Sequence, residues 1–183
     1  MVQKIVTPLT KETVAQLKAG DLVEISGVVY AARDAAHKRM IELLDQGQAL
    51  PFDIRESVIY YVGPSPAKPG HVIGSAGPTT SERMDAFAPR LIELGLSGMI
   101  GKGFRSREVI ETMIRCKAVY FGAIGGAGAL ISASIKSEKL LAFPDLGAEA
   151  IRELFVQDFP AIVIIDSNGN NLYETEIQKY RQG

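Results

Sequence analysis

Asp21-Leu-Val-Glu-Ile-Ser-Gly-Val-Val-Tyr-Ala-Ala32, continued by Arg33-Asp-Ala-Ala-His37, is a stretch in which a strand pattern gives way to a helix pattern. The first part is rich in β-branched residues, and its Gly27 predicts a bulge or a close approach of the backbone. The second part begins a helix predicted over 33–46, whose apolar residues recur at three- and four-residue spacing. A strand that leads directly into a helix favours an α/β fold.

The same alternation continues along the chain, and the last third is richer in strands. Further strands are predicted at 58–63, 71–75, 98–101, 118–122, 137–143, 151–156 and 161–165, and further helices at 9–17, 81–94, 105–115 and 125–134. Asn168-Gly169 after the last strand predicts a two-residue hairpin turn. The pattern gives the α/β class but leaves the strand order open.

Length and composition indicate an ordinary globular protein. The 183 residues suit one domain, so we treat residues 1–183 as a single domain. A net charge of -1 gives no reason to expect nucleic acid or an anionic membrane as a partner. The chain shows no secretory signal, its apolar tracts are too short to span a bilayer, and it has a single cysteine. We therefore expect a cytoplasmic location.

Soft metal ligands are scarce and scattered. The chain offers only His37, His71 and Cys116, which match neither a zinc spacing nor a cluster set of three or four cysteines. We therefore predict no metal ligands here, and any metal chemistry would need ligands from another chain. His37 is interpreted as a surface or capping residue, and Cys116 as a buried structural thiol.

Residues 71–85, His-Val-Ile-Gly-Ser-Ala-Gly-Pro-Thr-Thr-Ser-Glu-Arg-Met-Asp, combine a small-residue loop with the start of a predicted helix. The hydroxyls of Thr79, Thr80 and Ser81 fall where the helix would begin, and Arg83 follows. A helix N-terminus with free N–H groups, hydroxyls and an arginine suits a carboxylate or a phosphate. The same residues also suit a plain capped helix after a tight turn, and on chemistry alone both interpretations stay open.

Two further cations also fall at predicted strand ends. Arg33 follows the strand at 21–32, where α/β proteins usually bind ligands, although it could simply pair with Asp34 or Asp45. Lys102 lies between glycines in Gly98-Met-Ile-Gly-Lys-Gly103, which is not a Walker A sequence and could be a plain turn. The glycine-rich stretch 122–130 lacks dinucleotide-binding spacing and indicates tight packing or a ligand-approach loop. Together these groups could hold a dianion, and no electrophile accompanies them.

These residues resemble the β subunit, or C-terminal domain, of the iron–sulfur hydro-lyases, which are the class I fumarate hydratases and L(+)-tartrate dehydratases. The resemblance covers about residues 6–174. It rests on the motifs Gly77-Pro-Thr-Thr-Ser-Glu-Arg-Met-Asp85, Ala32-Arg-Asp-Ala-Ala-His37, Ile100-Gly-Lys-Gly103, Gly147-Ala-Glu-Ala-Ile-Arg-Glu-Leu154 and Asp158-Phe-Pro-Ala-Ile-Val-Ile-Ile-Asp166.

The resemblance implies a swivelling β/β/α domain, with a mixed sheet and flanking helices. In that family the domain closes over a [4Fe-4S] cluster held by three cysteines of an α subunit or N-terminal domain, and one iron binds the substrate as a Lewis acid. This chain has one cysteine, so the resemblance implies a separate β subunit in a higher hetero-oligomer with a cluster-bearing α subunit.

By the same resemblance, Arg33, Arg83 and Lys102 bind the carboxylates of a C4 dicarboxylate, together with Thr79 or Thr80. Thr79 is implied as the catalytic residue at the reacting hydroxyl, and the base would come from the partner. The implied reaction is the reversible hydration of fumarate to malate. Two alternatives remain open, namely an L(+)-tartrate dehydratase β subunit and a free-standing dicarboxylate-binding module.

Overall fold

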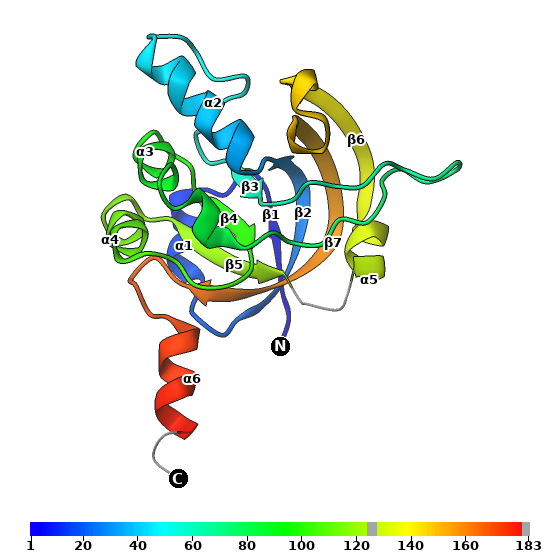
Figure 1. The fold of residues 1–183 in the computed structure, drawn as a ribbon. Helices are drawn as coiled ribbons and strands as arrows, with labels where there is room; N and C mark the ends of the chain where they lie inside the picture. Colours follow the sequence, from blue (N-terminus) through cyan, green and yellow to red (C-terminus); the bar gives the residue numbers. More distant parts are fainter. Residues whose placement is uncertain (124–127, 181–183) are drawn as a thin grey trace.

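The protein is described here from a computed structural model, in which residues 1–123 and 128–180 are placed. Its strands are β1 (Gln3–Val6), β2 (Leu22–Ala31), β3 (Val58–Tyr60), β4 (Gly98–Gly101), β5 (Val119–Ala123), β6 (Ile135–Ala142) and β7 (Ile151–Ile165). They form one sheet in the order β1-β2-β3-β4-β5-β7-β6, and β2 also pairs with β7 (Figure 1). Strands β2, β3, β4, β5 and β7 therefore close into a barrel. Strands β1 to β5 run parallel, whereas β7 is antiparallel to β2, β5 and β6.

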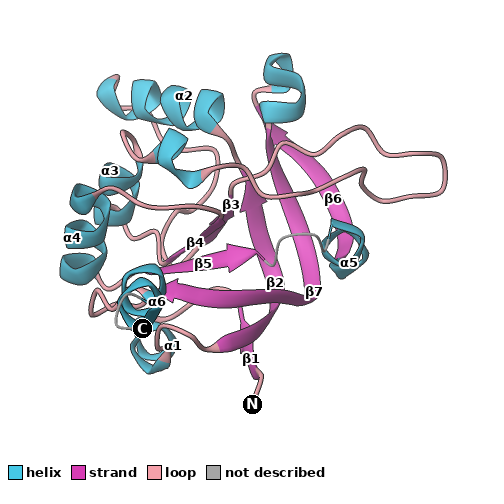
Figure 2. Cartoon of the chain, turned by 60° about the horizontal axis from the view of Figure 1, so that its bottom comes forward, coloured by secondary structure: helices cyan, strands magenta, loops and turns pink. Residues whose placement is uncertain are grey.

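The helices confirm the mixed α/β class, with a sheet and flanking helices. They are α1 (Lys11–Gln16), α2 (Asp34–Asp45), the 3₁₀ turn η1 (Ser81–Met84), α3 (Ala88–Glu93), α4 (Arg107–Cys116), α5 (Gly128–Ser134), the 3₁₀ segment η2 (Pro144–Glu149) and α6 (Leu172–Tyr180). Helices α2, α3 and α4 lie along one side of the barrel (Figure 2). Within the described residues, every helix is too short or too polar to cross a lipid bilayer.

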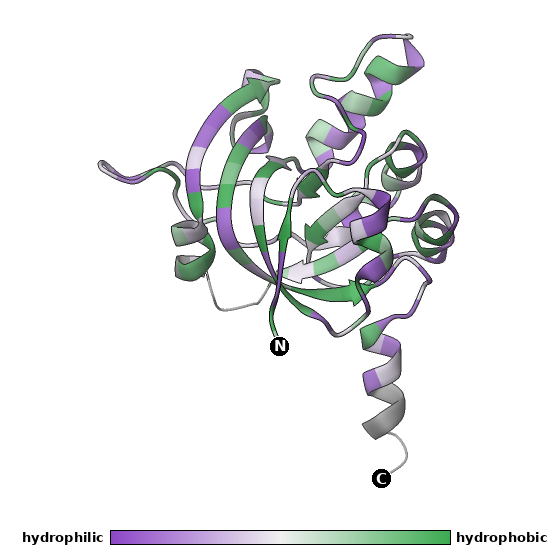
Figure 3. Cartoon of the chain, turned by 180° about the vertical axis from the view of Figure 1, so that it is seen from behind, coloured by the Kyte–Doolittle hydropathy of each residue, from purple (hydrophilic) through white to green (hydrophobic). Residues whose placement is uncertain are grey.

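Alternation along the strands creates two hydrophobic cores. In β3 and the residues after it, Val58, Tyr60 and Val62 face the barrel interior, whereas Ile59 and Tyr61 face the helices. Successive side chains of a strand point to opposite faces, so the inner parallel strands β3, β4 and β5 serve both cores and are buried throughout. Strands β6 and β7 are different, because hydrophilic and hydrophobic residues follow one another along them (Figure 3).

Strand β7 is continuous, so the prediction of two separate strands at 151–156 and 161–165 is wrong. A register shift against β2 occurs near residue 26. There Asp158 adopts a positive φ of 51°, and its N–H donates to the Ser26 hydroxyl at 3.0 Å. A bulge therefore absorbs the irregular residues between the two apolar runs, and pairing continues on both sides of it.

Gly27 lies at this register shift, and the predicted close approach is confirmed. Its φ is +117°, and a Cβ placed there would lie 2.4 Å from the Thr7 hydroxyl oxygen. Only glycine fits both the conformation and the space. The neighbouring prediction for 33–46 is also confirmed, because α2 covers Asp34–Asp45 and Gly47 follows with a φ of +69°.

The helix predicted at 81–94 is broken into η1 and α3. Pro89 lies in the first turn of α3, where its missing N–H and fixed φ are tolerated, but it could not continue a helix from residue 81. The chain turns at Asp85 and Phe87, whose N–H groups donate to Glu82 and Met84 carbonyls. The break separates the segment that carries Arg83 from the packed helix α3.

Three smaller predictions also fail. The strand at 71–75 is absent, and residues 61–79 form a long excursion instead. Asn168-Gly169 is a turn closed by one antiparallel bridge between Ile165 and Asn171, but no second strand follows, because α6 begins at Leu172. Cys116 is partly exposed. The predicted helix at 125–134 is confirmed as α5 from residue 128, and residues 124–127 lie outside the described part.

Candidate functional site

The five site residues predicted from the sequence all lie at the carboxyl ends of neighbouring parallel strands. Arg33 follows β2 and begins α2. The Thr79 N–H donates to the Tyr61 carbonyl, just beyond β3, at 2.7 Å. Thr80 forms a parallel bridge with Lys102, directly after β4. This edge of an α/β sheet is where such folds usually bind ligands, and Arg83 of η1 lies beside it, 3.8 Å from Asp34 at the start of α2.

Asp34 lies between the two arginines of this edge. Its Oδ1 is 3.6 Å from Arg33 Nη2, and its Oδ2 is 3.8 Å from Arg83 Nη2. Both distances exceed a hydrogen bond, so the guanidinium groups keep donors for another carboxylate. Glu149 of η2 makes a closer ion pair with Arg33 Nη2, at 2.9 Å. Sequence analysis did not identify Glu149 as a site residue, although it lies in the motif at 147–154, because its contact with Arg33 spans more than a hundred residues.

The start of α2 holds three buried polar atoms that lack a hydrogen-bond partner among the described residues. They are Arg33 Nε, Asp34 Oδ1 and His37 Nε2. Buried polar groups are nearly always hydrogen-bonded, and an unsatisfied one costs about 1–3 kcal/mol. Their concentration in five consecutive residues marks this corner as the place where the chain lacks polar contacts. The three atoms belong to Arg33 or lie close to it, and the Arg33 side chain is partly exposed.

His37 is fully buried, so its interpretation as a surface or capping residue is wrong. Its Nδ1 donates to the Arg33 carbonyl at 2.8 Å, and its ring meets the Tyr61 ring edge-on at 5.4 Å. Burial lowers the pKa of His37 to about 4, so the ring is neutral at pH 7. His37 therefore holds the backbone of Arg33 and is not a base open to solvent.

Gly63 makes room for the Arg33 side chain. A Cβ at Gly63 would lie 2.8 Å from Arg33 Cδ and 3.3 Å from the Ala148 carbonyl oxygen. The arginine stem thus lies between the segment after β3 and η2, and its side chain keeps 23% of its surface exposed. Such packing orients the guanidinium and leaves its tip accessible.

The segment 77–85 is held against the sheet edge by backbone hydrogen bonds, so it is not the free N-terminus of a helix. The N–H groups of Thr79 and Ser81 donate to the Tyr61 and Lys102 carbonyls, at 2.7 and 2.9 Å. The expectation of free N–H groups at a helix N-terminus is therefore wrong at these two residues. The Ser81 side chain is also buried, which leaves half-buried Thr79 and exposed Thr80 as the accessible hydroxyls of the segment.

Lys102 is exposed, and its amine has no ion pair or hydrogen bond with any residue that the structure describes. The glycine before it has a packing role, because a Cβ at Gly101 would lie 2.0 Å from the Ser81 hydroxyl oxygen. The lysine is thus an unpaired cation on a backbone that is packed closely against the segment carrying Arg83.

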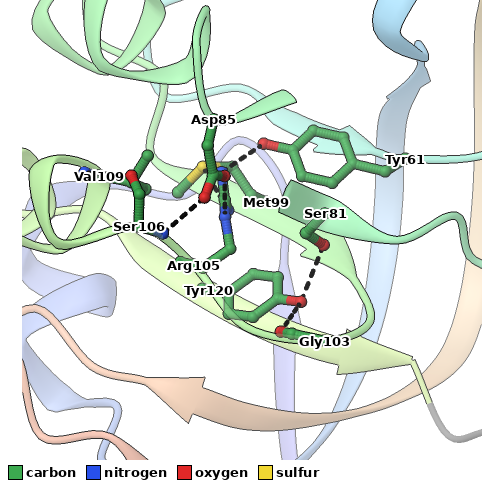
Figure 4. A network of polar contacts seen from close by, with 9 residues as sticks. All are labelled: Tyr61, Ser81, Asp85, Met99, Gly103, Arg105, Ser106, Val109 and Tyr120. Carbon is green, nitrogen blue, oxygen red and sulfur yellow. Dashed lines mark hydrogen bonds and ion pairs between the residues drawn. The ribbon is translucent and has the colours of Figure 1, made fainter. Parts of the chain in front are cut away.

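A buried polar network lies behind this edge (Figure 4). Arg105 Nε donates to Asp85 Oδ1 at 2.7 Å, and the Ser106 N–H donates to Asp85 Oδ2 at 2.5 Å. The Arg105 guanidinium also lies over the Tyr61 and Tyr120 rings, 5.3 and 4.9 Å from their centroids. Sequence analysis missed this network, although Asp85 closes the motif at 77–85 and Arg105 follows Lys102 by three residues.

Metal-binding groups are not assembled in the described part of the chain. Residues 1–123 and 128–180 contain no group of three His, Cys, Asp or Glu side chains placed to hold a metal ion. Cys116 belongs to a groove with Asp53, Glu56 and Glu93, which neither Arg33 nor Arg83 lines. The residues present therefore do not fit an iron–sulfur cluster held by this chain alone.

Comparison with known proteins gives a consistent picture. Residues 2–176 match the family described as Fumarase C-terminus. The chain is 44% identical over 177 residues to a Methanocaldococcus jannaschii protein with the provisional name L(+)-tartrate dehydratase subunit beta, covering 93% of this chain and 90% of that protein. It is 38% identical to Leishmania major fumarate hydratase 2 and to the anaerobic class I fumarate hydratase of Escherichia coli, covering 89% and 92% of this chain. It spans 29% and 32% of the length of those two enzymes.

Proposed function

Because the chain belongs to the Fumarase C-terminus family, we propose that it is the β subunit of an iron–sulfur hydro-lyase. The proposed reaction is the reversible hydration of fumarate to malate. The [4Fe-4S] cluster would be held by an α subunit, since this chain has a single cysteine. In this proposal residues 1–183 act as one domain that swivels against the α subunit, within a cytoplasmic hetero-oligomer.

The proposal depends mainly on the contacts and the partial exposure of the Arg33 side chain. Its Nε is buried without a hydrogen-bond partner, and it lies beside Asp34, which also faces Arg83. The Arg33 side chain keeps 23% of its surface exposed, and the fork geometry of a guanidinium suits a carboxylate. Two such arginines and the unpaired Lys102 on one sheet edge suit a substrate with two carboxylates.

The proposed roles follow from charge and placement. Arg33, Arg83 and Lys102 bind the two substrate carboxylates, and Thr80 contributes its exposed hydroxyl. Thr79 lies at the reacting hydroxyl as the catalytic residue of this chain. Abstraction of a proton beside a carboxylate builds negative charge, which fixed cations stabilise in the transition state. The catalytic base would come from the α subunit.

The length of the relatives also bears on the proposal. The chain spans about a third of the two fumarate hydratases but most of the M. jannaschii protein, whose name includes "subunit beta". The match to most of a protein whose name includes "subunit beta" supports the proposed role of a β subunit, which would complete its site with another chain. The exposure of Thr80, Arg83 and Lys102 agrees with half of a site that a partner would cover.

The decisive experiment compares the purified chain with the same chain reconstituted with a candidate α subunit and iron–sulfur cluster. We expect fumarate hydration by the complex and none by the chain alone. Hydration at enzyme-like rates by the lone, iron-free chain would overturn the subunit assignment. Calorimetric titration of the lone chain with malate tests the free-standing binding module, for which tight binding without a partner is required.

A second candidate is an L(+)-tartrate dehydratase β subunit, which the 44% identity to the M. jannaschii protein favours. Tartrate differs from malate by one hydroxyl, and a site built to hydrogen-bond that hydroxyl discriminates strongly. Turnover of L(+)-tartrate and of malate by the same complex decides between the two candidates. A much higher kcat/KM for tartrate would replace the fumarate assignment.

A further inference from the structure

The network behind the site joins the two segments that carry Arg83 and Lys102. The Tyr120 hydroxyl lies 3.0 Å from the Gly103 carbonyl oxygen and 2.8 Å from the Ser81 hydroxyl oxygen. A carbonyl only accepts, so the phenol donates to Gly103 and the Ser81 hydroxyl donates to the phenol oxygen. One side chain of β5 thus connects the residue after Lys102 with the residue two positions before Arg83 (Figure 4).

A second connection runs between the same two segments. Asp85, two residues after Arg83, accepts from Arg105 Nε and from the Ser106 N–H, at 2.7 and 2.5 Å. Arg105 is completely buried and Asp85 nearly so, which protects the pair from screening by salt. The guanidinium lies over the Tyr120 ring at 4.9 Å, so the two connections support each other.

The packing between the connections leaves little space for movement. The Ser81 hydroxyl oxygen lies where a Cβ on Gly101 would be 2.0 Å away, and the Ser81 N–H donates to the Lys102 carbonyl at 2.9 Å. Two backbone segments packed this closely cannot slide past one another without breaking buried hydrogen bonds. The separation of their α-carbons is therefore held by Tyr120 and Ser81.

We propose that Tyr120 is a positioning residue that holds the Arg83 and Lys102 segments at one separation and thereby selects the length of the dicarboxylate. The inference rests on the proposed function, in which Arg83 and Lys102 bind substrate carboxylates. Tyr120 is fully buried and acts only through its two hydrogen-bond partners. If the two cations shift relative to each other, a substrate of one fixed length loses its match to both.

The test is the variant Tyr120→Phe in the complex with the cluster-bearing partner. It removes the phenol hydroxyl and keeps the ring under Arg105. Succinate and glutarate serve as competitive inhibitors, because they differ by one methylene between the carboxylates. The wild type should prefer one of the two inhibitors, and this preference should weaken in the variant. We expect the ratio of the two inhibition constants to be roughly threefold or more closer to one than in the wild type. A merely structural loss would lower the amount of active enzyme and leave this ratio unchanged.

Two further measurements separate the possible outcomes. Ser57→Ala is the matched control, because it removes a buried hydroxyl that donates to the Ile54 carbonyl at the amino end of β3. It should leave the inhibitor ratio unchanged. Amide hydrogen exchange at Ser81 in the isolated chain should be faster in Tyr120→Phe than in the wild type, because the N–H to Lys102 loses its support.

An active complex whose inhibitor ratio is the same in Tyr120→Phe and wild type would overturn this inference and leave the proposed function standing. Unchanged exchange at Ser81 would also overturn it. An inactive wild-type complex would instead overturn the proposed function together with the selection of substrate length. In that case faster exchange at Ser81 would still support Tyr120 as the connection between the two segments.

Discussion

The start of α2 and the Asp85–Arg105 cluster both bury charged groups next to the same sheet edge, yet they differ in how those groups are satisfied. At Arg33, Asp34 and His37, three buried atoms lack a hydrogen-bond partner among the described residues. At Asp85 both carboxylate oxygens accept hydrogen bonds within the chain. The first region leaves polar atoms without partners among the described residues, whereas the second satisfies its carboxylate within the chain. We therefore call the start of α2 and the cations beside it the binding region, and the Asp85–Arg105 cluster, which stabilises the fold, the supporting region.

The largest effect is expected from a substitution that disrupts the supporting region. Asp85→Ala leaves Arg105 buried without its counter-ion, which should lower the free energy of unfolding by about 3–5 kcal/mol. Denaturant unfolding of the isolated chain measures it. Asp53→Ala removes an exposed partner of Arg55 and is the control, with almost no shift of the midpoint expected. A small loss in Asp85→Ala would mean that the cluster does not support the fold.

The second largest effect is expected on turnover, from a substitution in the binding region that leaves the chain folded. Arg33→Ala in the active complex should lower kcat/KM by roughly 10²–10³-fold, the range seen when one donor to developing charge is removed. Circular dichroism should show the same fold. Arg39→Ala, on the same helix and paired with Asp145, is the control and should keep wild-type kinetics. Equal kinetics in both variants would remove Arg33 from the site.

The third effect concerns pH. Burial lowers the pKa of folded His37 to about 4 from 6.5, against a hydrogen bond to the Arg33 carbonyl and the charge of Asp34, and the charge of Arg105 lowers it further. Between pH 6.5 and 4 the unfolded chain binds the proton and the folded chain does not. The stabilisation is therefore full above pH 6.5, and up to about 3 kcal/mol is lost as the pH falls to 4.

His37→Asn tests this pH dependence, because asparagine can still donate to the Arg33 carbonyl but does not titrate. The free energy of unfolding of the variant should change less between pH 7 and 4 than that of the wild type. His71→Asn, on the exposed excursion, is the control and should keep the wild-type slope. Identical slopes in all three proteins would show that His37 is not the titrating group.

The smallest effect sharpens the comparison. Lys102 is exposed and makes no ion pair with the described residues, so Lys102→Ala should change the free energy of unfolding by about 0.5 kcal/mol or less. In the active complex the same change should lower kcat/KM strongly. A residue that matters for turnover and not for stability belongs with the binding region. A large loss of stability would place Lys102 with the supporting one.

Local patterns predicted the parts of the fold that depend on neighbours in sequence. The strand at 21–32, the helix after it and the close approach at Gly27 all follow from composition and spacing, and all are confirmed. The continuity of β7 could not be predicted, because the bulge at Asp158 is stabilised by Ser26, more than a hundred residues away. The break in the helix predicted at 81–94 could have been predicted locally, because Pro89 is a signal that a helix does not continue through it.

The same division applies to the candidate site. Arg33 and Lys102 were predicted at strand ends and Arg83 near a helix start, and the structure brings their segments to one edge. Their surroundings could not be predicted, because Glu149 reaches Arg33 from η2 and Tyr61 buries His37 from the next strand. Burial and ion pairing depend on tertiary contacts, and no spacing within the chain encodes them.

The pairing of β2 with β7 has a consequence for synthesis of the protein. Leu22 pairs with Ile162, about 140 residues later, and this pairing closes the barrel. At a translation rate of roughly 5–20 residues per second, the edge of β2 waits for its neighbour for about 7–28 s. During that time β2 can pair with β1 and β3, but its edge toward β7 stays open, and open strand edges invite aggregation. Late closure therefore leaves this edge open to wrong pairing until β7 has been made.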